Sequence, residues 1–466
     1  MLFFQLFNIT LSFKLYHMKP FFFALSLFIF CISCTKRSTS TLKYDILKEK
    51  ERAQLRDEIL KNRFNNLLPT LMDETGLDMW VVISREYNED PVLKTMLPAV
   101  WLNARRRTIL VFYRDLKKNT IEKLAVARYD VGKHIKSAWN KEEEPDQWKA
   151  LRNIIEARNP KRIGINTSTH FALADGLVKT DYEAFYESVT PAIRDKFVSA
   201  EKLAIRWIET RTTQEMQLYH KLVAITHGII DEAFSSNVII PGETTTEDVV
   251  WWMRQRVTDL GLKTWFHPTV DVQRSDEPLN SEVYAFSKEA HPQTIFPGDL
   301  LHCDFGISYM GLNTDCQQHA YVLQKEEEEV PEFLVNAFAK GNRLQDILTS
   351  AMQTGITGNE ILAASLKQAK DEGLVPAIYS HPLGSFGHSA GTTIGMWDAQ
   401  GGVPVRGDYP LHNNTVYAIE LNTTVAIDKW QKDIRIMLEE AGHFSAGKHA
   451  YVNGRQEAIK AIQIAY

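Results

Sequence analysis

Two aspartates stand inside apolar, strand-like segments of the chain, and this feature strongly restricts the possible fold. Asp304 lies in the apolar segment 300–306, and Asp315 follows 11 residues later, before the apolar segment 320–323. An odd separation suits two residues that face each other across an antiparallel pair of strands. Two apposed, half-buried carboxylates raise each other's pKa unless a cation lies between them. The pair alone allows a metal site, but it also allows one buried aspartate in a turn and one exposed aspartate.

Further candidate ligands follow downstream. His381 and His388 stand seven residues apart in a glycine-rich segment, and Glu420 is embedded in an apolar strand-like segment. A buried glutamate is costly unless it is paired or bound to a metal. The next strand-like segment ends in two acids, Glu439 and Glu440.

The order Asp, Asp, His, Glu, Glu, starting with Asp-Phe-Gly and Thr-Asp 11 residues apart, resembles the M24 metallopeptidases. These include the methionine aminopeptidases, the Xaa-Pro aminopeptidases and the prolidases. The helix start at 212–215 also resembles the domain junction of this family. The resemblance implies an α/β N-terminal domain of the creatinase type, followed by an α+β catalytic domain with the pita-bread fold. We also expect a homodimer.

Carried over residue by residue, the resemblance implies five metal ligands, with Asp315 as the bridge between two ions and Glu420 as the general acid/base. The ligands would be Asp304, Asp315, His381, Glu420 and Glu439. The family separates its metal histidine from a later substrate histidine by seven residues, with a glycine three residues after the first. Gly384 fits that spacing, so His381 is the expected ligand and His388 the expected substrate contact.

Two positions require a choice between neighbours. The family usually reads Arg-x-Glu on its last strand, whereas Arg435 is followed here by an acid only at Glu439. Because side chains alternate along a strand, Arg435 and Glu439 share a face and Glu440 points away. His291 is the expected upstream substrate histidine, with His267 as the alternative.

The resemblance implies a metal-dependent exopeptidase that hydrolyses the N-terminal bond of peptides, at Xaa-Pro, with water activated by a dinuclear centre. The oxygen-rich ligand set suits two divalent ions, and we expect Mn²⁺, with Co²⁺ or Zn²⁺ as alternatives. Two other functions stay open: a prolidase restricted to dipeptides, and a non-hydrolytic binding protein of the same fold. Gln318 and Ser389 depart from the family pattern, which leaves substrate choice open.

The most apolar stretch lies at the start of the chain. Met18 and Lys19 precede an apolar run of about a dozen residues, which has the pattern of a secretory signal. The run ends at Cys34, in a sequence that resembles a bacterial lipobox. We therefore expect residues 1–34 to form a signal peptide, with 1–17 as an upstream extension, and 35–48 to form a tether. The body would be exported to the periplasm and held by a lipid on Cys34; an ordinary signal peptide or an uncleaved anchor is the alternative.

Composition supports a soluble body with two domains. The chain carries 53 basic and 58 acidic residues, a net charge of −5, so it is not built to bind nucleic acid. Strand-like and helical segments alternate over residues 49–206, as in an α/β domain, and we expect the catalytic domain at 207–466.

Four cysteines in 466 residues exclude a disulfide scaffold. If Asp304 faces Asp315, the same register makes Cys303 face Cys316 on the other side of the strand pair. These two cysteines would form either one cross-strand disulfide or two packed free thiols.

Overall fold

The computed structural model of the protein describes residues 44–276 and 291–463. The expected signal peptide, with Cys34 and the first part of the tether, lies outside these ranges. Within them, no helix has the length and the apolar character that crossing a lipid bilayer requires.

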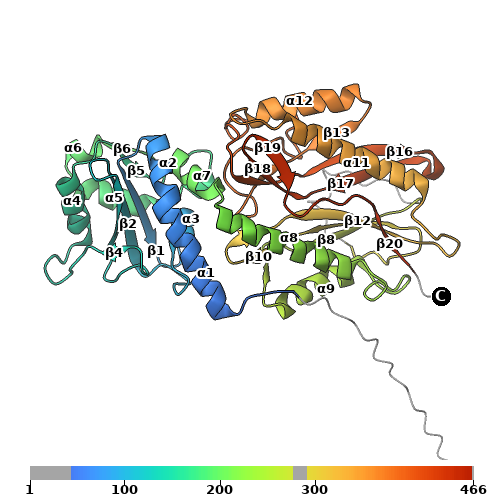
Figure 1. The fold of residues 1–466 in the computed structure, drawn as a ribbon, viewed down its shortest axis with the longest axis horizontal. Coiled ribbons are helices and arrows are strands. Elements are labelled where there is room, and N and C mark those ends of the chain that lie inside the picture. Colours follow the sequence, from blue (N-terminus) through green and yellow to red (C-terminus); the bar gives the residue numbers. More distant parts are fainter. Residues whose placement is uncertain (1–43, 277–290, 464–466) are drawn as a thin grey trace, which may run out of the picture. The chain divides into compact units, whose positions relative to one another are not determined.

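A six-stranded mixed sheet, in the order β4-β3-β2-β1-β5-β6, organises the first half of the described chain (Figure 1). Its strands are β1 Met79–Arg85, β2 Arg107–Asp115, β3 Thr120–Val126, β4 Lys136–Ser137, β5 Ile163–Ile165 and β6 Phe197–Ser199. The helices around it are α1 Glu49–Asn62, α2 Leu68–Thr75, α3 Pro91–Met96, α4 Gln147–Arg158, α5 Lys179–Ser188, α6 Pro191–Arg194 and α7 Glu201–Glu209. A π-helical turn, Arg63–Leu67, joins α1 to α2.

Both faces of this sheet are buried, because alternate residues of its central strands enter two different cores. Trp80 and Val82 of β1 pack in one core, with Trp207 of α7. Val81 of β1 packs in the other core, with Leu151 of α4. Helices on both faces of a mostly apolar sheet are typical of α/β domains. The expected α/β class of this region is confirmed.

Four smaller sheets form the second half of the described chain. Their orders are β11-β10-β7, β20-β12-β9-β8, β13-β16-β17 and β14-β15-β18-β19. The strands are β7 Lys263–Thr264, β8 Thr269–Gln273, β9 Leu300–Phe305, β10 Ile307–Tyr309, β11 Leu312–Asn313, β12 Cys316–Val322, β13 Val375–Ile378, β14 His381–Leu383, β15 Thr415–Ala418, β16 Leu421–Ile427, β17 Lys432–Leu438, β18 Ala441–Ser445, β19 Lys448–Tyr451 and β20 Lys460–Ile462.

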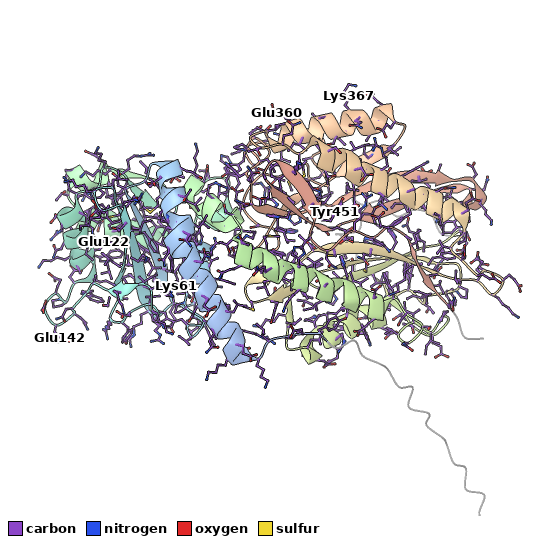
Figure 2. The ribbon with its side chains drawn as sticks, viewed as in Figure 1. Lys61, Glu122, Glu142, Glu360, Lys367 and Tyr451 are labelled. Carbon is purple, nitrogen blue, oxygen red and sulfur yellow. The ribbon has the colours of Figure 1, made fainter. Side chains whose placement is uncertain are left out.

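Two pairs of helices cover these sheets from different sides (Figure 1). They are α8 Thr213–Ala233 and α9 Thr246–Asp259, and α11 Glu332–Ala351 and α12 Gly358–Asp371. Helix α8 packs against β9 and β12, whereas α11 packs against β16 and β17. Figure 2 labels Glu360 and Lys367, two exposed residues on the outer helix α12. Strands β9, β12, β16 and β17 therefore lie between the helix pair α8 and α9 and the helix pair α11 and α12.

Helix α8 begins at the expected helix start with a capping box, in which Thr212 and Glu215 satisfy each other's backbone N–H groups. The buried Glu215 carboxylate also accepts from Arg63 at 2.8 Å and from Arg211 at 3.2 Å. This cluster ties the turn after α1 to the start of α8. The domain boundary expected at 206/207 falls inside α7 and stays a prediction.

Strands β12 and β17 belong to different sheets, yet they meet at one isolated pair of residues, Gln317 and Glu439. The N–H of Gln317 donates to the carbonyl of Glu439 at 2.9 Å, and the N–H of Glu439 donates back at 3.3 Å. We call this contact the sheet junction, and the candidate ligands gather around it.

Candidate metal centre

The hairpin that carries Asp304 and Asp315 has a different register from the expected one. Asp304 of β9 lies opposite Gln317 of β12, so the prediction that it faces Asp315 is wrong. The reason is the two-residue turn at Met310 and Gly311, where φ is 55° and 84°, which centres the hairpin one residue later. A register shift of two residues keeps every side chain on its face. Both aspartates therefore still point to the same side.

The cysteines shift in the same way. Cys303 lies opposite Gln318, and Cys316 lies opposite Phe305, so the expected facing pair is not formed. Both cysteines are buried free thiols. Of the two alternatives that the sequence left open, the structure has the free thiols.

His381 and the two glutamates approach the aspartates from other strands. His381 opens β14, and its Nε2 lies 3.8 Å from Asp315 Oδ2, 3.9 Å from Glu420 Oε2 and 3.7 Å from Glu439 Oε1. The register of β16 and β17, continued by one residue, places Glu420 opposite Glu439. Asp304, Asp315 and Glu439 also hold ligand-type atoms within 4.8 Å of one another. The structure thus brings all five expected ligands together.

Four atoms in this group are buried and lack a hydrogen-bond partner. They are Asp304 Oδ1, Asp315 Oδ1, His381 Nε2 and Glu439 Oε1. A buried polar atom without a partner costs about 1–3 kcal/mol, and more if it is charged. Divalent cations would satisfy all four atoms, so the donor set fits the ions that the ligand pattern implies.

The tautomer of His381 also fits a metal ligand. Its Nδ1 lies 3.1 Å from the carbonyl oxygen of Pro382, to which it donates. This hydrogen bond leaves the lone pair of Nε2 directed at the carboxylates, as is usual for metal-bound histidines. Burial lowers the pKa of His381 to about 4, so the imidazole is neutral at physiological pH.

The pKa values of the carboxyl groups are raised, whereas that of His381 is lowered. Burial raises the pKa of Asp304 to about 6. Burial, and then the charges of Glu439 and Asp304, raise the pKa of Asp315 well above its usual range. Burial, and then the charge of Asp304, raise the pKa of Glu439 well above its usual range. Bound cations reverse such shifts, because they favour the ionised carboxylates.

Gln317 is a site residue that the sequence reasoning missed. Its Nε2 donates to Glu420 Oε1 at 2.8 Å and to Glu439 Oε2 at 3.0 Å. Its Oε1 accepts from His302 Nε2 at 3.0 Å, and His302 Nδ1 lies 3.4 Å from Asp271 Oδ2. One amide therefore positions two candidate ligands. Its place two residues after Asp315, on the same face of the strand, was a signal that could have identified it.

The adjacent acids Glu439 and Glu440 have different partners. Glu440 lies on the opposite face, where its Oε2 is 2.6 Å from His227 Nε2 and its Oε1 accepts from Gln318 Nε2 at 3.0 Å. Glu439, in contrast, directs a partnerless Oε1 at His381.

The substrate histidines are placed differently. His388 is exposed, and its ring stands perpendicular to that of His381, with centroids 4.8 Å apart. The ring centroid of Trp265 lies 5.2 Å from that of His388, again in an edge-to-face arrangement. His291 is exposed and lies outside the groups of ligand atoms, so its role stays a prediction. The alternative, His267, is exposed and contacts Trp251, with ring centroids 5.4 Å apart.

Comparisons with known proteins agree with this geometry. Residues 217–441 match the model of metallopeptidase family M24, while no curated protein matches the chain. An X-Pro aminopeptidase from Thermotoga maritima MSB8 has a similar fold, with a TM-score of 0.60 and 13% identity over 84% of this chain and 100% of that one. A Xaa-Pro dipeptidase from Bacillus anthracis has a TM-score of 0.57 and 14% identity, covering 89% of this chain and 100% of that one. A prolidase from Pyrococcus horikoshii OT3 has a TM-score of 0.54 and 14% identity, covering 86% of this chain and 99% of that one.

These similarities confirm the expected architecture, an α/β N-terminal region followed by a pita-bread catalytic region. The family match rests on the segment that contains Asp304, Asp315, His381, Glu420 and Glu439. Residues 217–441 are therefore a segment of the metallopeptidase family M24 type, and the protein is a hydrolytic metallopeptidase that resembles the Xaa-Pro aminopeptidases and prolidases.

Proposed function

We propose that the protein is an exopeptidase that removes the N-terminal residue of peptides, at Xaa-Pro bonds. The observation that carries this proposal is the convergence of four buried, partnerless ligand atoms beside the exposed histidine His388. The preference for proline rests on the similar fold of the X-Pro aminopeptidase and prolidase structures.

Five residues would hold two divalent ions: Asp304, Asp315, His381, Glu420 and Glu439. When bound, such ions polarise the scissile carbonyl and lower the pKa of water. Four carboxylates and one imidazole form a mostly hard donor set, for which we propose Mn²⁺ as the native ion.

Glu420 would move the proton. Its side chain keeps 21% of its surface exposed, whereas that of Glu439 keeps 1%, so Glu420 is the acid that substrate can reach. Gln317 holds Glu420 Oε1 and leaves Oε2 on the side of His381. In this role Glu420 Oε2 accepts a proton from the attacking water and then gives it to the leaving amine.

His388 would contact the substrate from the exposed side of the site. A histidine there can donate a hydrogen bond to the oxygen on which charge develops during attack. We propose that His291 helps to hold the substrate.

A direct test is hydrolysis of Arg-Pro-Pro and Gly-Pro by metal-stripped protein that has been supplied with Mn²⁺. We expect cleavage that requires the metal and is lost in His381→Ala. The variant His170→Ala, at an exposed histidine of the N-terminal region, is the matched control and should keep full activity. Absence of cleavage of any Xaa-Pro peptide would reject the proposal.

A substrate series of increasing length separates the two exopeptidase types. Cleavage of Gly-Pro together with longer Xaa-Pro peptides supports an aminopeptidase. Cleavage of Gly-Pro alone would identify a prolidase restricted to dipeptides.

We propose further that the enzyme works outside the cytoplasm, tied to the cell envelope by a lipid on Cys34. The sequence pattern at the start of the chain supports this placement. Labelling cells with a radioactive fatty acid should mark the wild-type protein and not Cys34→Ala. A label that survives this substitution would reject the lipid attachment.

A further inference from the structure

A second group of ligand-type side chains lies close to the catalytic group. It consists of His227 from α8, Cys316 from β12 and Glu440, which follows β17. One nitrogen, one sulfur and one oxygen atom from these residues lie within 4.8 Å of one another. We call these three residues the sulfur group.

Strand alternation places this group on the face opposite the catalytic ligands. Cys316 directly follows Asp315, and Glu440 directly follows Glu439, so each neighbour points the other way. The same two backbone segments thus present two groups of potential ligands, one on each side of the sheet junction. The proposed peptidase function does not use the sulfur group.

The glutamate of the sulfur group is oriented in the way that metal ligands usually are. Glu440 Oε1 accepts from Gln318 Nε2 at 3.0 Å and from the N–H of Gln456 at 3.1 Å. Its other oxygen, Oε2, is thereby directed at His227 Nε2, 2.6 Å away. Hydrogen bonds to the outer atoms of a ligand orient it towards the ion.

The histidine is oriented similarly and is also accessible. His227 Nδ1 lies 3.3 Å from the Asn453 side-chain amide, whose oxygen could accept from Nδ1 after a flip of the amide. The His227 side chain is 16% exposed, which gives an ion a route to the group. Cys316 is a free, fully buried thiol at the third corner.

We propose that His227, Cys316 and Glu440 bind one transition-metal ion, Zn²⁺ or Co²⁺, at a third site separate from the catalytic pair. Imidazole, thiolate and carboxylate are all ligands of zinc, and three protein ligands leave a fourth tetrahedral position for water. To free both ligand atoms, Cys316 releases its thiol proton to solvent, and the proton between His227 Nε2 and Glu440 Oε2 leaves Nε2 for Nδ1 or for solvent. The bound ion links α8 to the strands that carry Asp315 and Glu439.

Cobalt distinguishes the two groups, because the catalytic ligands include no sulfur. The test uses the full chain with Cys31→Ser and Cys34→Ser, which leaves Cys303 and Cys316 as its thiols. Titration of the metal-free protein with Co²⁺ should give a near-ultraviolet thiolate-to-cobalt absorption band and three bound ions per chain. Addition of Zn²⁺ should then remove the band.

Two further variants assign the band. Cys316→Ser should abolish it and reduce the stoichiometry from three ions to two. Cys303→Ser is the matched control, since Cys303 is an equally buried thiol on the neighbouring strand, and it should leave the band unchanged. His381→Ala should also keep the band, which separates this result from any failure of the catalytic site.

The proposal is overturned if saturating Co²⁺ gives two ions per chain and no sulfur band. The three side chains then form only an ion pair beside a packed thiol. If Cys316→Ser fails to fold, His227→Gln provides the same test, and loss of the band in that variant supports the site. A band that persists in folded His227→Gln excludes it.

Discussion

Buried acids in the two halves of the chain have different surroundings. In the N-terminal region, Asp90 is 1% exposed, and burial raises its pKa to about 6. Its Oδ1 caps α3 by accepting from the N–H groups of Val92 and Leu93, and its Oδ2 accepts from Asn166 at 2.9 Å. Asp315 of the catalytic region is equally hidden, yet its Oδ1 has no partner.

Burial alone therefore does not distinguish a structural acid from a ligand. Burial raises the pKa of both carboxyl groups, but both oxygens of Asp90 accept hydrogen bonds, whereas Asp315 Oδ1 has no partner. Asp315, Asp304 and Glu439 each have a buried carboxylate oxygen without a partner, which a bound cation would satisfy.

Glu420→Gln should lower kcat about 10²–10⁴-fold, because the amide cannot take up the proton that the reaction moves. The free energy of unfolding of the metal-free variant should not fall, because the amide has the size of the carboxyl group and its Oε1 can still accept from Gln317. Steady-state kinetics with an Xaa-Pro peptide and urea denaturation measure the two quantities. Glu457→Gln, at a side chain that is 72% exposed, is the control and should leave kcat unchanged. Equal losses of kcat in both variants would remove Glu420 from the mechanism.

Gln317→Ala should weaken metal binding or activity about 10–100-fold, because two ligand carboxylates lose the amide that orients them. Excess Mn²⁺ should restore part of the activity, which a general loss of folding would not allow. The measurement is a metal titration of the stripped enzyme with activity as the readout. Gln368→Ala on α12, where the amide donates to the surface residue Glu372, is the control. An unchanged metal titration would show that Gln317 does not position the ligands.

Asp315→Asn should stabilise the metal-free protein more than Asp90→Asn does. A carboxyl whose pKa is raised on folding destabilises the folded state above its ordinary pKa, and an amide removes that cost at either position. At Asp90 the gain is offset by about 1–3 kcal/mol, because Asn166 Nδ2 loses the acceptor Oδ2, although the new amide oxygen can still cap α3. Asp315→Asn has no such offset at the partnerless Oδ1 and should raise the free energy of unfolding by about 0.5–2 kcal/mol.

Urea denaturation at pH 8 with a chelator measures both variants. The contrast between the two halves fails if both substitutions destabilise the protein equally.

His319 provides the smallest effect, through pH. Burial lowers its pKa to about 3, while its Nδ1 donates to the Leu301 carbonyl and its Nε2 accepts from the Met437 N–H. Below pH 6.5 His319 binds a proton in the unfolded chain but not in the folded protein. The free energy of unfolding therefore falls as the pH falls towards 3. Between pH 6.5 and 5.5 the wild type should lose about 1 kcal/mol more than His319→Gln.

Denaturation of the metal-free proteins at both pH values measures this difference. Equal losses of the free energy of unfolding in wild type and variant would show that His319 can accept a proton in the folded protein.

The sequence predicted much of this fold because its signals were local. Strand-like and helical segments over residues 49–206 indicated the α/β region, and residues 212–215 indicated the start of α8. Strand parity distinguished Glu439 from Glu440, because that choice requires only the direction of each side chain.

Signals that depend on distant partners were weaker. The register of the hairpin was misjudged by two residues, because the position of its turn at Met310 and Gly311 was not recognised. Gln317 was overlooked, since an amide becomes a site residue only when Glu420 and Glu439 arrive from other strands. The assignment of His291 still depends on sequence spacing alone.

The sheet junction has a consequence for how the catalytic region unfolds. Gln317 and Glu439 join two sheets through one pair of backbone hydrogen bonds, and the ligands come from both sides of that contact. Ions bound there would link the two layers and make them lose their structure as one cooperative unit. Without ions, ionised carboxylates among these ligands repel one another across that contact. The atoms that equip this enzyme for hydrolysis would then also determine whether its catalytic half melts in one transition or in two.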